Sequence, residues 1–487
     1  MKFILLFFTL PFICFGQVSI DWDAPVAVAE SSFGNQHPRI VLDRNNNPMV
    51  LWGNMDESAP YFSRWNGSEF MIPIRVTPEA MEVFTASWAG PDIAAFGDTI
   101  YVVFKENPED MAPAYCIHSY NGGMTFSDPV VLDGMIGDNI SRFPSVTVNE
   151  VGQPIVAFMK LDSDFGNARY VVATSDDFGN SFNMDVLASD FSGGDVCDCC
   201  PVSVTSENNY VATLYRDNLD NLRNSWAGIS TNGGSTFMNG IQIDQTDWVI
   251  NACPSTGPDG VIIGDSLYSV FMSAATGEER VYFSASSLST LSASSAERLS
   301  FEILELDLEN YPRIANYGNT VTIVWKDVIF DSQIELQFTS NIENRFSNST
   351  IDVTLYNLEN YNPINSDVAV SSTDVHVVWQ EGTNGTVMYR KGTYADPVSI
   401  NDQHSPESFI LYPNPASNQI NISVSDNVDG NIEFVLSDVS GKNLFTSKYM
   451  DAQLIPIDIT NLPSGLYFIA IKDETCKEYN QIFSVFK

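Results

Sequence analysis

Basic side chains and histidines are scarce in this chain. Its 487 residues include 23 lysines and arginines against 61 aspartates and glutamates, a formal net charge of −38, and 4 histidines. So acidic a surface repels nucleic acid and anionic lipid, and neither is an expected partner. Beyond the first residues, no run approaches the roughly 20 apolar residues that cross a bilayer, so we expect no transmembrane segment in the mature chain.

The first residues do contain an apolar run. The stretch MKFILLFFTLPFICFGQ places one lysine before this run and ends in small and polar residues, which is typical of a secretory signal peptide. We therefore assign residues 1–16 to a signal peptide. The bulky Phe-Ile pair before Cys14 lacks the small residue that lipid attachment needs, so the prediction is simple export into an oxidising environment.

A proline that opens a short apolar strand recurs seven times. The spacing is 51 to 57 residues, and a second strand that ends in an aromatic residue follows each time. This period is the size of a four-stranded propeller blade. It predicts an all-β fold with a seven-bladed β-propeller at residues 17–400, in which residues 18–30 add a closing strand. The seven prolines are Pro38, Pro91, Pro144, Pro201, Pro258, Pro312 and Pro363.

A second repeat lies in three turns between the predicted third and fourth strands. Each turn has the pattern Ser-x-Asp/Asn-x-Gly-x-Ser/Thr-Phe, which resembles the Asp-box, or BNR repeat, of sialidase-superfamily propellers. The resemblance implies a structural turn in which the acidic or amide side chain binds the backbone, the glycine supplies the unusual dihedral and the aromatic ring packs between strands. The residues are Ser119, Asn121, Gly123, Thr125 and Phe126; Ser175, Asp177, Gly179, Ser181 and Phe182; and Ser230, Asn232, Gly234, Thr236 and Phe237.

The end of the chain has a different pattern. Residues 401–407 are polar and predict a linker, and the alternating strands of residues 408–487 predict a small β-sandwich. The segments LYPNPASNQINI, LSDVSGK and ITNLPSGLYFIAI follow one another in this part and resemble the C-terminal (Por) sorting domain of type IX secretion in Bacteroidetes. The resemblance implies that the type IX secretion machinery is a partner and that the protein is secreted or at the cell surface.

The blade topology sorts side chains between two edges. First strands begin and second strands end at one edge, which we name the proline rim, and the Asp-box turns lie at the other. Six basic residues at the proline rim predict a site for a carboxylated or sulfated glycan. The alternative is that they pair with acidic neighbours in the same loops, such as Glu106 and Asp217. The six are Arg39, Lys105, Lys160, Arg216, Arg313 and Lys326.

Two proline-rim segments, His37–Ile40 and Tyr311–Ile314, read His/Tyr-Pro-Arg-Ile. They resemble the sialidase motif whose arginine binds the substrate carboxylate, although proline and arginine stand in the opposite order. With Arg216 the resemblance implies a three-arginine clamp, and a retaining mechanism would use a tyrosine nucleophile with a glutamate partner and an aspartate acid. Sialidases have six blades, whereas this chain repeats seven times. The catalytic candidates are Tyr311, Glu309, Asp92 and Asp259.

Seven blades with a cationic rim also resemble the propeller polysaccharide lyases. Such enzymes need a cation that neutralises the uronate carboxylate, with a histidine or tyrosine as base and acid. Among the histidines, His37 lies at the proline rim, whereas His118 and His376 lie on predicted strands. A lyase would therefore use His37 or a tyrosine as its base and acid.

Four cysteines precede the first strands of two adjacent blades. Cys197, Cys199 and Cys200 come before Pro201, and Cys253 comes before Pro258. Two disulfides are predicted, with a vicinal Cys199–Cys200 bond as one pairing. A four-thiolate structural zinc site is the alternative, although the two C-x-x-C pairs typical of such sites are not both present. We expect no other metal or cofactor.

These features predict an exported sialidase-like propeller that recognises an anionic glycan. Two enzymatic alternatives remain open, an exo-sialidase-like glycosidase and a polysaccharide lyase acting on a uronic-acid glycan. The third alternative is a non-catalytic glycan-binding or adhesion protein.

Overall fold

The computed structural model describes residues 20–110, 112–132, 139–300, 308–328, 332–344, 346, 350–354, 362–382, 384–394, 409–412, 416–424, 431–438, 442–450, 454–472, 478–485 and 487. The predicted signal peptide, residues 1–16, and linker, residues 401–407, lie outside them. The described part is all-β, as predicted, with one short 3-10 helix, η1 (Ile342–Asn344). It contains no helix that is long and apolar enough to cross a membrane. The chain divides into two compact units, Met1–Tyr394 and Ala395–Lys487.

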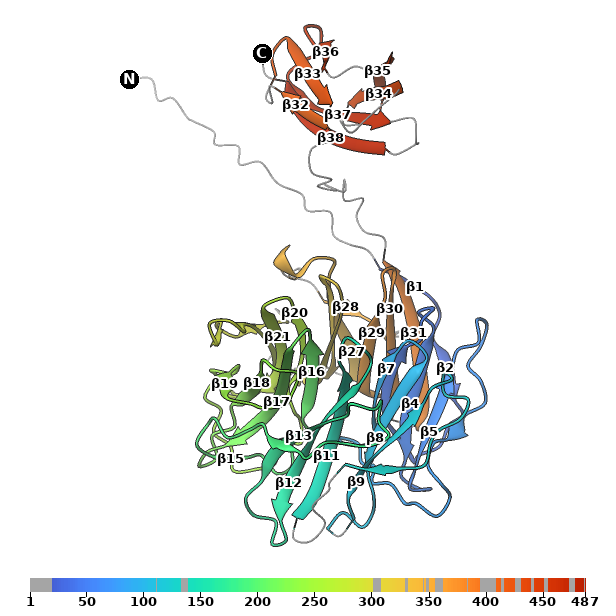
Figure 1. Cartoon of the computed structure of the whole chain (residues 1–487), viewed down its shortest axis with the longest axis vertical. Coiled ribbons are helices and arrows are strands. Elements are labelled where there is room, and N and C mark those ends of the chain that lie inside the picture. Colours follow the sequence, from blue (N-terminus) through green and yellow to red (C-terminus); the bar gives the residue numbers. More distant parts are fainter. Residues whose placement is uncertain are drawn as a thin grey trace. The chain divides into compact units, whose positions relative to one another are not determined.

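The described part of the first unit contains seven antiparallel sheets of four or five strands (Figure 1), which we number in chain order. Sheet 1 has β3 (Asn35–Leu42), β4 (Pro48–Asn54), β5 (Ala59–Arg64) and β6 (Ile74–Arg75). Sheet 2 has β7 (Asp92–Phe96), β8 (Thr99–Lys105), β9 (Ala114–Ser119) and β10 (Val130–Val131). Sheet 3 has β11 (Asn139–Val148), β12 (Pro154–Asp162), β13 (Arg169–Thr174) and β14 (Val186–Leu187).

Sheets 4 to 7 are likewise built from strands that follow one another in the chain. Sheet 4 has β15 (Asp195–Val196), β16 (Ser203–Glu207), β17 (Tyr210–Asn218), β18 (Ser225–Ser230) and β19 (Asn239–Gln242). Sheet 5 has β20 (Asp259–Ile263), β21 (Ser266–Ser273), β22 (Arg280–Ser287), β23 (Ser292–Ala293) and β24 (Glu297–Arg298). Sheet 6 has β25 (Asn310–Tyr317), β26 (Thr320–Val328), β27 (Ser332–Thr339) and β28 (Ile351–Asp352). Sheet 7 has β29 (Pro363–Val370), β30 (Asp374–Glu381) and β31 (Thr386–Tyr394), joined by β1 (Ile20–Trp22) and β2 (Val26–Ala29).

The hydrophobic core lies between neighbouring sheets. Leu51 and Phe62 of sheet 1 pack with Val102 of sheet 2, and Val28 of sheet 7 packs with Trp52 of sheet 1. Both faces of the middle strands are therefore apolar, and seven of the nine residues from Pro154 to Asp162 are β-branched, aromatic or otherwise apolar and buried. The sequence of such a strand is a continuous apolar run because neither face of the strand is exposed to water.

The first strands of the sheets contact one another in sequence, and the last returns to the first. The contacting pairs are β3 and β7, β7 and β11, β11 and β16, β16 and β20, β20 and β25, β25 and β29, and β29 and β3. Sheet 7 contains both ends of the unit, because β31 pairs with β1 and β2. Figure 1 shows this pairing where orange β31 lies beside blue β2. The strand expected from residues 18–30 thus pairs as predicted.

The three Ser-x-Asp/Asn-x-Gly-x-Ser/Thr-Phe turns share one hydrogen-bond pattern. In the first, the Ser119 hydroxyl accepts from the Gly123 amide at 3.0 Å, and the Asn121 side-chain oxygen accepts from the Thr125 amide at 3.0 Å. The same two bonds form within residues 175–181 and 230–236. The glycines have φ of 77°, 87° and 85°, a region that favours glycine. The turns are therefore held by their own side chains.

Replacing Gly123 with alanine is expected to destabilise the first unit. A Cβ at this position would lie 2.2 Å from Cε1 of Phe62, in addition to requiring φ of +77°. Overpacking of this kind costs about 1–3 kcal/mol. Thermal unfolding of the purified protein would measure it. Gly233→Ala is the matched control because φ is also positive there and nothing lies within 4 Å; equal effects at both positions would mean that the Phe62 contact is irrelevant.

The second unit contains two sheets in its described residues. One has β32 (Phe409–Tyr412), β33 (Gln419–Val424) and β36 (Leu454–Asp458), and the other has β35 (Asn443–Met450), β34 (Asn431–Asp438), β37 (Gly465–Lys472) and β38 (Glu478–Val485). Ile420 and Ile422 of the first sheet share a buried cluster with Phe434 and Ile469 of the second. One core therefore serves both sheets.

Candidate functional site

The seven sheets meet around a pocket of about 70 Å³ at the proline rim. Every sheet contributes lining residues from the start of its first strand or from the loop just before it. We name this the axial pocket. Its lining includes His37, Arg39, Gly90, Asp92, Phe143, Ser145, Pro201, Val202, Gly257, Tyr311, Arg313 and Asn365, with Trp88 from the loop before β7.

Four of the first strands bulge where they reach the axial pocket. The pairing shifts between Gln36 and Arg39, and the same shift occurs in β11, β25 and β29. At each bulge one non-glycine residue has a positive φ, which costs about 1–3 kcal/mol and concentrates at functional sites. These residues, all in the pocket lining, are His37, Phe143, Tyr311 and Asn365.

His37 and Arg39 form a buried pair in the pocket wall. Nη2 of Arg39 donates to Nε2 of His37 at 2.6 Å, and Nη1 of Arg39 donates to the Pro38 carbonyl at 2.9 Å. Burial and the nearby Arg39 and Arg313 lower the pKa of His37 well below its ordinary value, so the ring is neutral. Burial and Arg313 also lower the pKa of Arg39 to about 10. Arg39 therefore stays charged at neutral pH.

Arg313 lies between two carboxylates. Its Nε is 3.0 Å from Oδ1 of Asp367 and 3.4 Å from Oδ2 of Asp259. Burial alone would lower the pKa of Arg313, but Asp259, Asp367 and Asp92 raise it above its ordinary value. Both carboxylates bind Nε, and the described residues make no hydrogen bond to the two terminal nitrogens. Arg313 thus keeps its charge, and its side chain is 24% exposed at the pocket.

Three aspartates of the pocket region tie neighbouring sheets together. Asp92 accepts from the Val146 amide at 3.1 Å, Asp259 accepts from the Ile314 amide at 3.0 Å, and Asp367 accepts from the Ile40 amide at 3.0 Å. Each bond joins one first strand to the next around the ring. The predicted acids Asp92 and Asp259 therefore hold backbone amides, and burial raises the pKa of Asp259.

Arg216 does not reach the axial pocket. Its side chain is fully buried, and its three nitrogens donate to the carbonyls of Thr256, Arg223 and Met272 at 3.2, 2.7 and 2.7 Å. The guanidinium also lies over the Trp248 ring, 5.4 Å from its centroid. The structure therefore does not bring Arg216 into a clamp with Arg39 and Arg313, because backbone carbonyls occupy its nitrogens.

The three predicted lysines also lie outside the pocket lining. Lys105 is buried and donates to the Ala112 carbonyl, and burial lowers its pKa to about 8. Lys160 pairs with Asp185 at 2.5 Å. Burial lowers the pKa of Lys326, and the charge of Glu279 partly opposes this shift. Of the six predicted cations, the pocket thus brings together Arg39 and Arg313.

The structure places the two catalytic candidates Tyr311 and Glu309 in different surroundings. Tyr311 lines the pocket, and burial raises the pKa of its phenol. Glu309 has no exposed surface; its carboxylate accepts from the Val281 amide at 2.7 Å and pairs with Arg298 at 3.3 Å. Glu309 is therefore held within the structure of sheet 5 and is not available to assist Tyr311.

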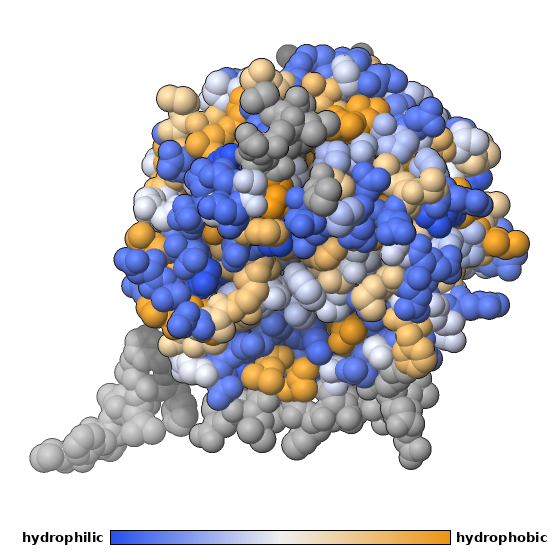
Figure 2. Space-filling view, turned by 90° about the horizontal axis from the view of Figure 1, so that it is seen from below, coloured by the Kyte–Doolittle hydropathy of each residue, from blue (hydrophilic) through white to orange (hydrophobic). Residues whose placement is uncertain are grey.

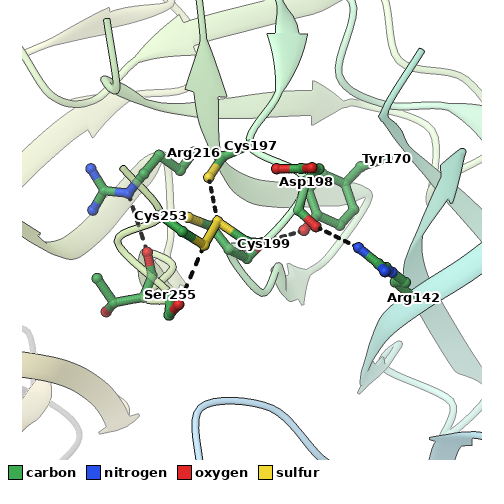
Figure 3. Close-up of a disulfide and its surroundings, with 10 residues drawn as sticks. Arg142, Tyr170, Cys197, Asp198, Cys199, Arg216, Cys253 and Ser255 are labelled. Atoms are coloured by element: carbon green, nitrogen blue, oxygen red, sulfur yellow. Dashed lines mark hydrogen bonds between the residues drawn. A yellow bond between two sulfur atoms is a disulfide. The ribbon is translucent and has the colours of Figure 1, made fainter. Parts of the chain in front are cut away.

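The cysteine cluster lies in the two loops that reach the pocket through Pro201 and Gly257 (Figure 3). Cys199 and Cys253 form a disulfide, whereas Cys197 and Cys200 are buried free thiols. A vicinal Cys199–Cys200 bond is therefore wrong, and one of the two predicted disulfides is present. The sulfur atoms of Cys197, Cys199 and Cys200 lie within 4.8 Å of one another. Because Cys199 is bonded to Cys253, two thiols remain, which is fewer than the four donors of a closed zinc site.

Sequence reasoning missed Trp88, Phe143 and Asn365 as pocket residues. A signal for one of them exists in the chain: Phe143 precedes a repeat proline, as His37 and Tyr311 do. All three of these residues before a repeat proline have a positive φ and line the pocket. Trp88 comes from a loop with no repeat position.

Solved structures share the architecture of this chain. An ulvan lyase of a new polysaccharide lyase family, bound to a GlcA(1-4)Rha3S saccharide, has a TM-score of 0.50 and 9% identity over 77% of this chain and 98% of its own. A sialidase variant from Streptococcus pneumoniae has a TM-score of 0.41 and 10% identity over 75% of this chain and 69% of its own. An α-L-arabinanase from Penicillium chrysogenum has a TM-score of 0.41 and 13% identity over 77% and 98%. The chain is thus an all-β protein whose structural neighbours have propeller folds.

Residues 410–484 match the family model of the secretion system C-terminal sorting domain. The recognition made from the three C-terminal segments is confirmed. This domain marks the chain for export through type IX secretion, to the cell surface or the medium. No curated protein sequence matches the chain.

Proposed function

We propose that the seven sheets are the blades of one closed propeller spanning residues 17–400, and that residues 408–487 are a small β-sandwich that serves export. In this proposal the propeller recognises an anionic glycan outside the cell, with the axial pocket as the binding site. The continuous contacts of the first strands and the return of β31 to β1 and β2 support closure. The propeller neighbours, among them an ulvan lyase, support a carbohydrate ligand.

The hydrogen bonding of the Arg313 guanidinium is the observation that favours an anionic ligand. Two carboxylates bind its Nε, while the described residues leave its terminal nitrogens without a hydrogen bond. These two nitrogens form one edge of the guanidinium, and that edge suits the paired oxygens of a carboxylate or sulfate. Arg39 adds a second positive charge to the pocket wall.

The dimensions of the pocket restrict how much of a glycan can enter. A volume of about 70 Å³ is far below the roughly 300 Å³ or more of pockets that enclose a small-molecule ligand. It suits one acidic substituent, with the sugar chain lying across the surrounding rim loops. Hydrophilic residues dominate the face shown in Figure 2, with apolar residues in small separate areas, so that face offers no broad apolar surface.

Arg313→Gln is expected to weaken retention on uronic-acid or sulfated polysaccharides by roughly 10- to 100-fold, because a charge-assisted hydrogen bond contributes about 1.5–3 kcal/mol. Affinity electrophoresis of the purified full chain in gels containing ulvan or other anionic glycans would measure it. Arg44→Gln is the matched control, since the Arg44 side chain is 65% exposed and pairs with Asp98. Arg313→Lys keeps a cation beside Asp367 while removing the paired donors, and we expect it to lose binding too. Equal retention of wild type and Arg313→Gln would overturn the proposal, and equal retention of wild type and Arg313→Lys would mean that a positive charge suffices without the paired donors.

A polysaccharide lyase is the second candidate. Tyr311, a phenol whose pKa is raised by burial, shares the pocket with His37 and with the two arginines. A lyase needs such an acid or base beside a carboxylate-binding cation. Incubation with uronic-acid glycans and measurement of the ultraviolet absorbance of unsaturated ends would test it. Retention on a glycan without new unsaturated ends would leave the binding protein as the function.

The sialidase-like glycosidase receives less support. A retaining glycosidase of this kind would need Tyr311 with a glutamate partner and an aspartate acid. Glu309 is bound to the Val281 amide and Arg298, and Asp259 is bound to Arg313 and the Ile314 amide. The carboxylates of Glu309 and Asp259 therefore bind other groups of the protein and are not available for a glycosidase mechanism. Recognition of an anionic glycan is the function that we favour.

A further inference from the structure

Three sulfur atoms, those of Cys197, Cys199 and Cys253, lie next to one another in the two loops that reach the axial pocket. Sγ of Cys197 is 3.5 Å from Sγ of Cys199, which is itself bonded to Cys253. Figure 3 shows Cys197 pointing toward the disulfide from the side away from Ser255. A thiol in contact with a disulfide sulfur is the arrangement from which thiol–disulfide exchange begins.

The surroundings of Cys197 favour its thiolate form, which is the attacking species. A hydrogen bond from the Cys200 thiol, the Cys199 amide, and the positive charges of Arg223 and Arg216 together lower the pKa of Cys197 to about 7, against burial, which raises it. Arg223 is buried, and its Nε and Nη1 have no hydrogen-bond partner among the described residues. Burial raises the pKa of Cys200, so Cys200 is the donor of this pair and Cys197 the nucleophile.

The two sides of the disulfide differ in exposure. Cys199 is partly buried, whereas Cys253 is exposed. Cys253 therefore makes the better leaving group, because its thiolate is released into water. The same bond joins the segment ending in Pro201 and Val202 to the segment ending in Thr256 and Gly257, and all four of these residues line the pocket.

We propose that these cysteines form an internal thiol–disulfide exchange site, in which Cys197 displaces Cys253 from Cys199. The Cys197 thiol first loses its proton to water, and its sulfur then forms a bond with the Cys199 sulfur as the Cys199–Cys253 bond breaks. The electron pair leaves on Cys253, which takes a proton from water, so no net proton is released. One disulfide and two thiols exist before and after the step, so no oxidant or reductant is consumed. The proposal is independent of whether the pocket binds a glycan.

The exchange would release the second pocket loop from the first. In the disulfide state the loops pack closely, since a Cβ on Gly257 would lie 1.8 Å from the Pro201 carbonyl oxygen. After exchange the covalent link is confined to Cys197 and Cys199 within one loop, and the Cys253 thiol is exposed. The site would thus couple the position of the disulfide to the lining of the axial pocket.

Alkylation of the exported full chain tests this step. The non-reduced protein is incubated with a large excess of N-ethylmaleimide at a series of pH values, so that the Cys253 thiol is trapped as it forms, and samples are quenched in acid at successive times and digested for mass spectrometry. We expect Cys253 to become alkylated over time, while the peptide with Cys197 and Cys199 retains an internal disulfide. The initial rate should rise with pH up to about 7, where the Cys197 thiolate is formed, and then level off.

Cys197→Ser is expected to abolish alkylation of Cys253 while the Cys199–Cys253 bond persists. Cys116→Ser is the matched control, because Cys116 is also a buried free thiol but lies on β9 of sheet 2. The pH series on wild type keeps the test decisive if the serine variant does not fold. Three results would overturn the proposal: no alkylation of Cys253 in wild type, equal alkylation in Cys197→Ser, or a tightly bound zinc ion that holds all four cysteines as thiolates.

Discussion

Arg216→Met is expected to lower the thermal midpoint of the first unit by roughly 5–10 °C. The Arg216 guanidinium is fully buried and donates to three main-chain carbonyls, two of which, Thr256 and Met272, belong to the loop before sheet 5 and to its second strand. Methionine fills similar space but leaves these carbonyls without a donor. Removing one member of a buried charged network costs about 3–5 kcal/mol.

The same variant separates a structural role from the ligand-binding role that the sequence predicts. Differential scanning calorimetry and glycan retention would be measured on the same preparation. Arg44→Met is the matched control, because it removes an equally long cation whose side chain is 65% exposed. An unchanged thermal midpoint with lost glycan retention would contradict the structural role. Arg216 would then bind the ligand, as the sequence predicts.

Much of the architecture could be predicted because it depends on local repeats. The seven prolines mark the first strand of each sheet, and the pairing of residues 18–30 with the end of the unit follows from the need to leave no open strand edge. The sorting domain could be recognised because its three segments stand in order in the chain. These features require no knowledge of which side chains meet across the fold.

The site could be predicted only in part, because position at the proline rim does not determine what a side chain contacts. Arg313 and Arg216 both follow the same topological rule, yet one lines the pocket and the other is enclosed by carbonyls of the next sheet. The carboxylates that orient Arg313 come from β20 and β29, far away in the sequence. Such contacts between distant strands leave no mark in the local pattern.

The cysteines illustrate a second limit. Four cysteines allow several pairings, and the sequence does not choose among them. The observed pairing depends on the fold, which brings the loop with Cys253 next to Cys199. It also depends on a turn in which the Cys200 amide donates to the Cys197 carbonyl at 3.2 Å. That turn keeps Cys197 and Cys200 buried on one side of the disulfide, which is the feature from which exchange is inferred.

Val28→Lys is expected to lower the thermal midpoint of the first unit by at least about 5 °C, through a cost of about 3 kcal/mol or more for placing a charge in an apolar core. Val28 is 5% exposed on β2 and packs with Trp52 of sheet 1 and Val387 of sheet 7. Because β2 covers the outer edge of β31, its loss would also expose an unpaired strand edge. We expect the variant to associate in size-exclusion chromatography.

Val26→Lys makes this prediction specific to the packing of β2 between sheets 1 and 7. Val26 lies on the same strand, two residues away, and is 38% exposed, so the same substitution there adds the charge without burying it. Destabilisation by Val28→Lys alone would mean that β2 is packed between the first and last sheets and holds the ends of the chain together. Similar thermal midpoints and similar elution for the two variants would mean that sheet 7 is stable without its N-terminal strand, and that the contact of β29 with β3 suffices to hold the last sheet against the first.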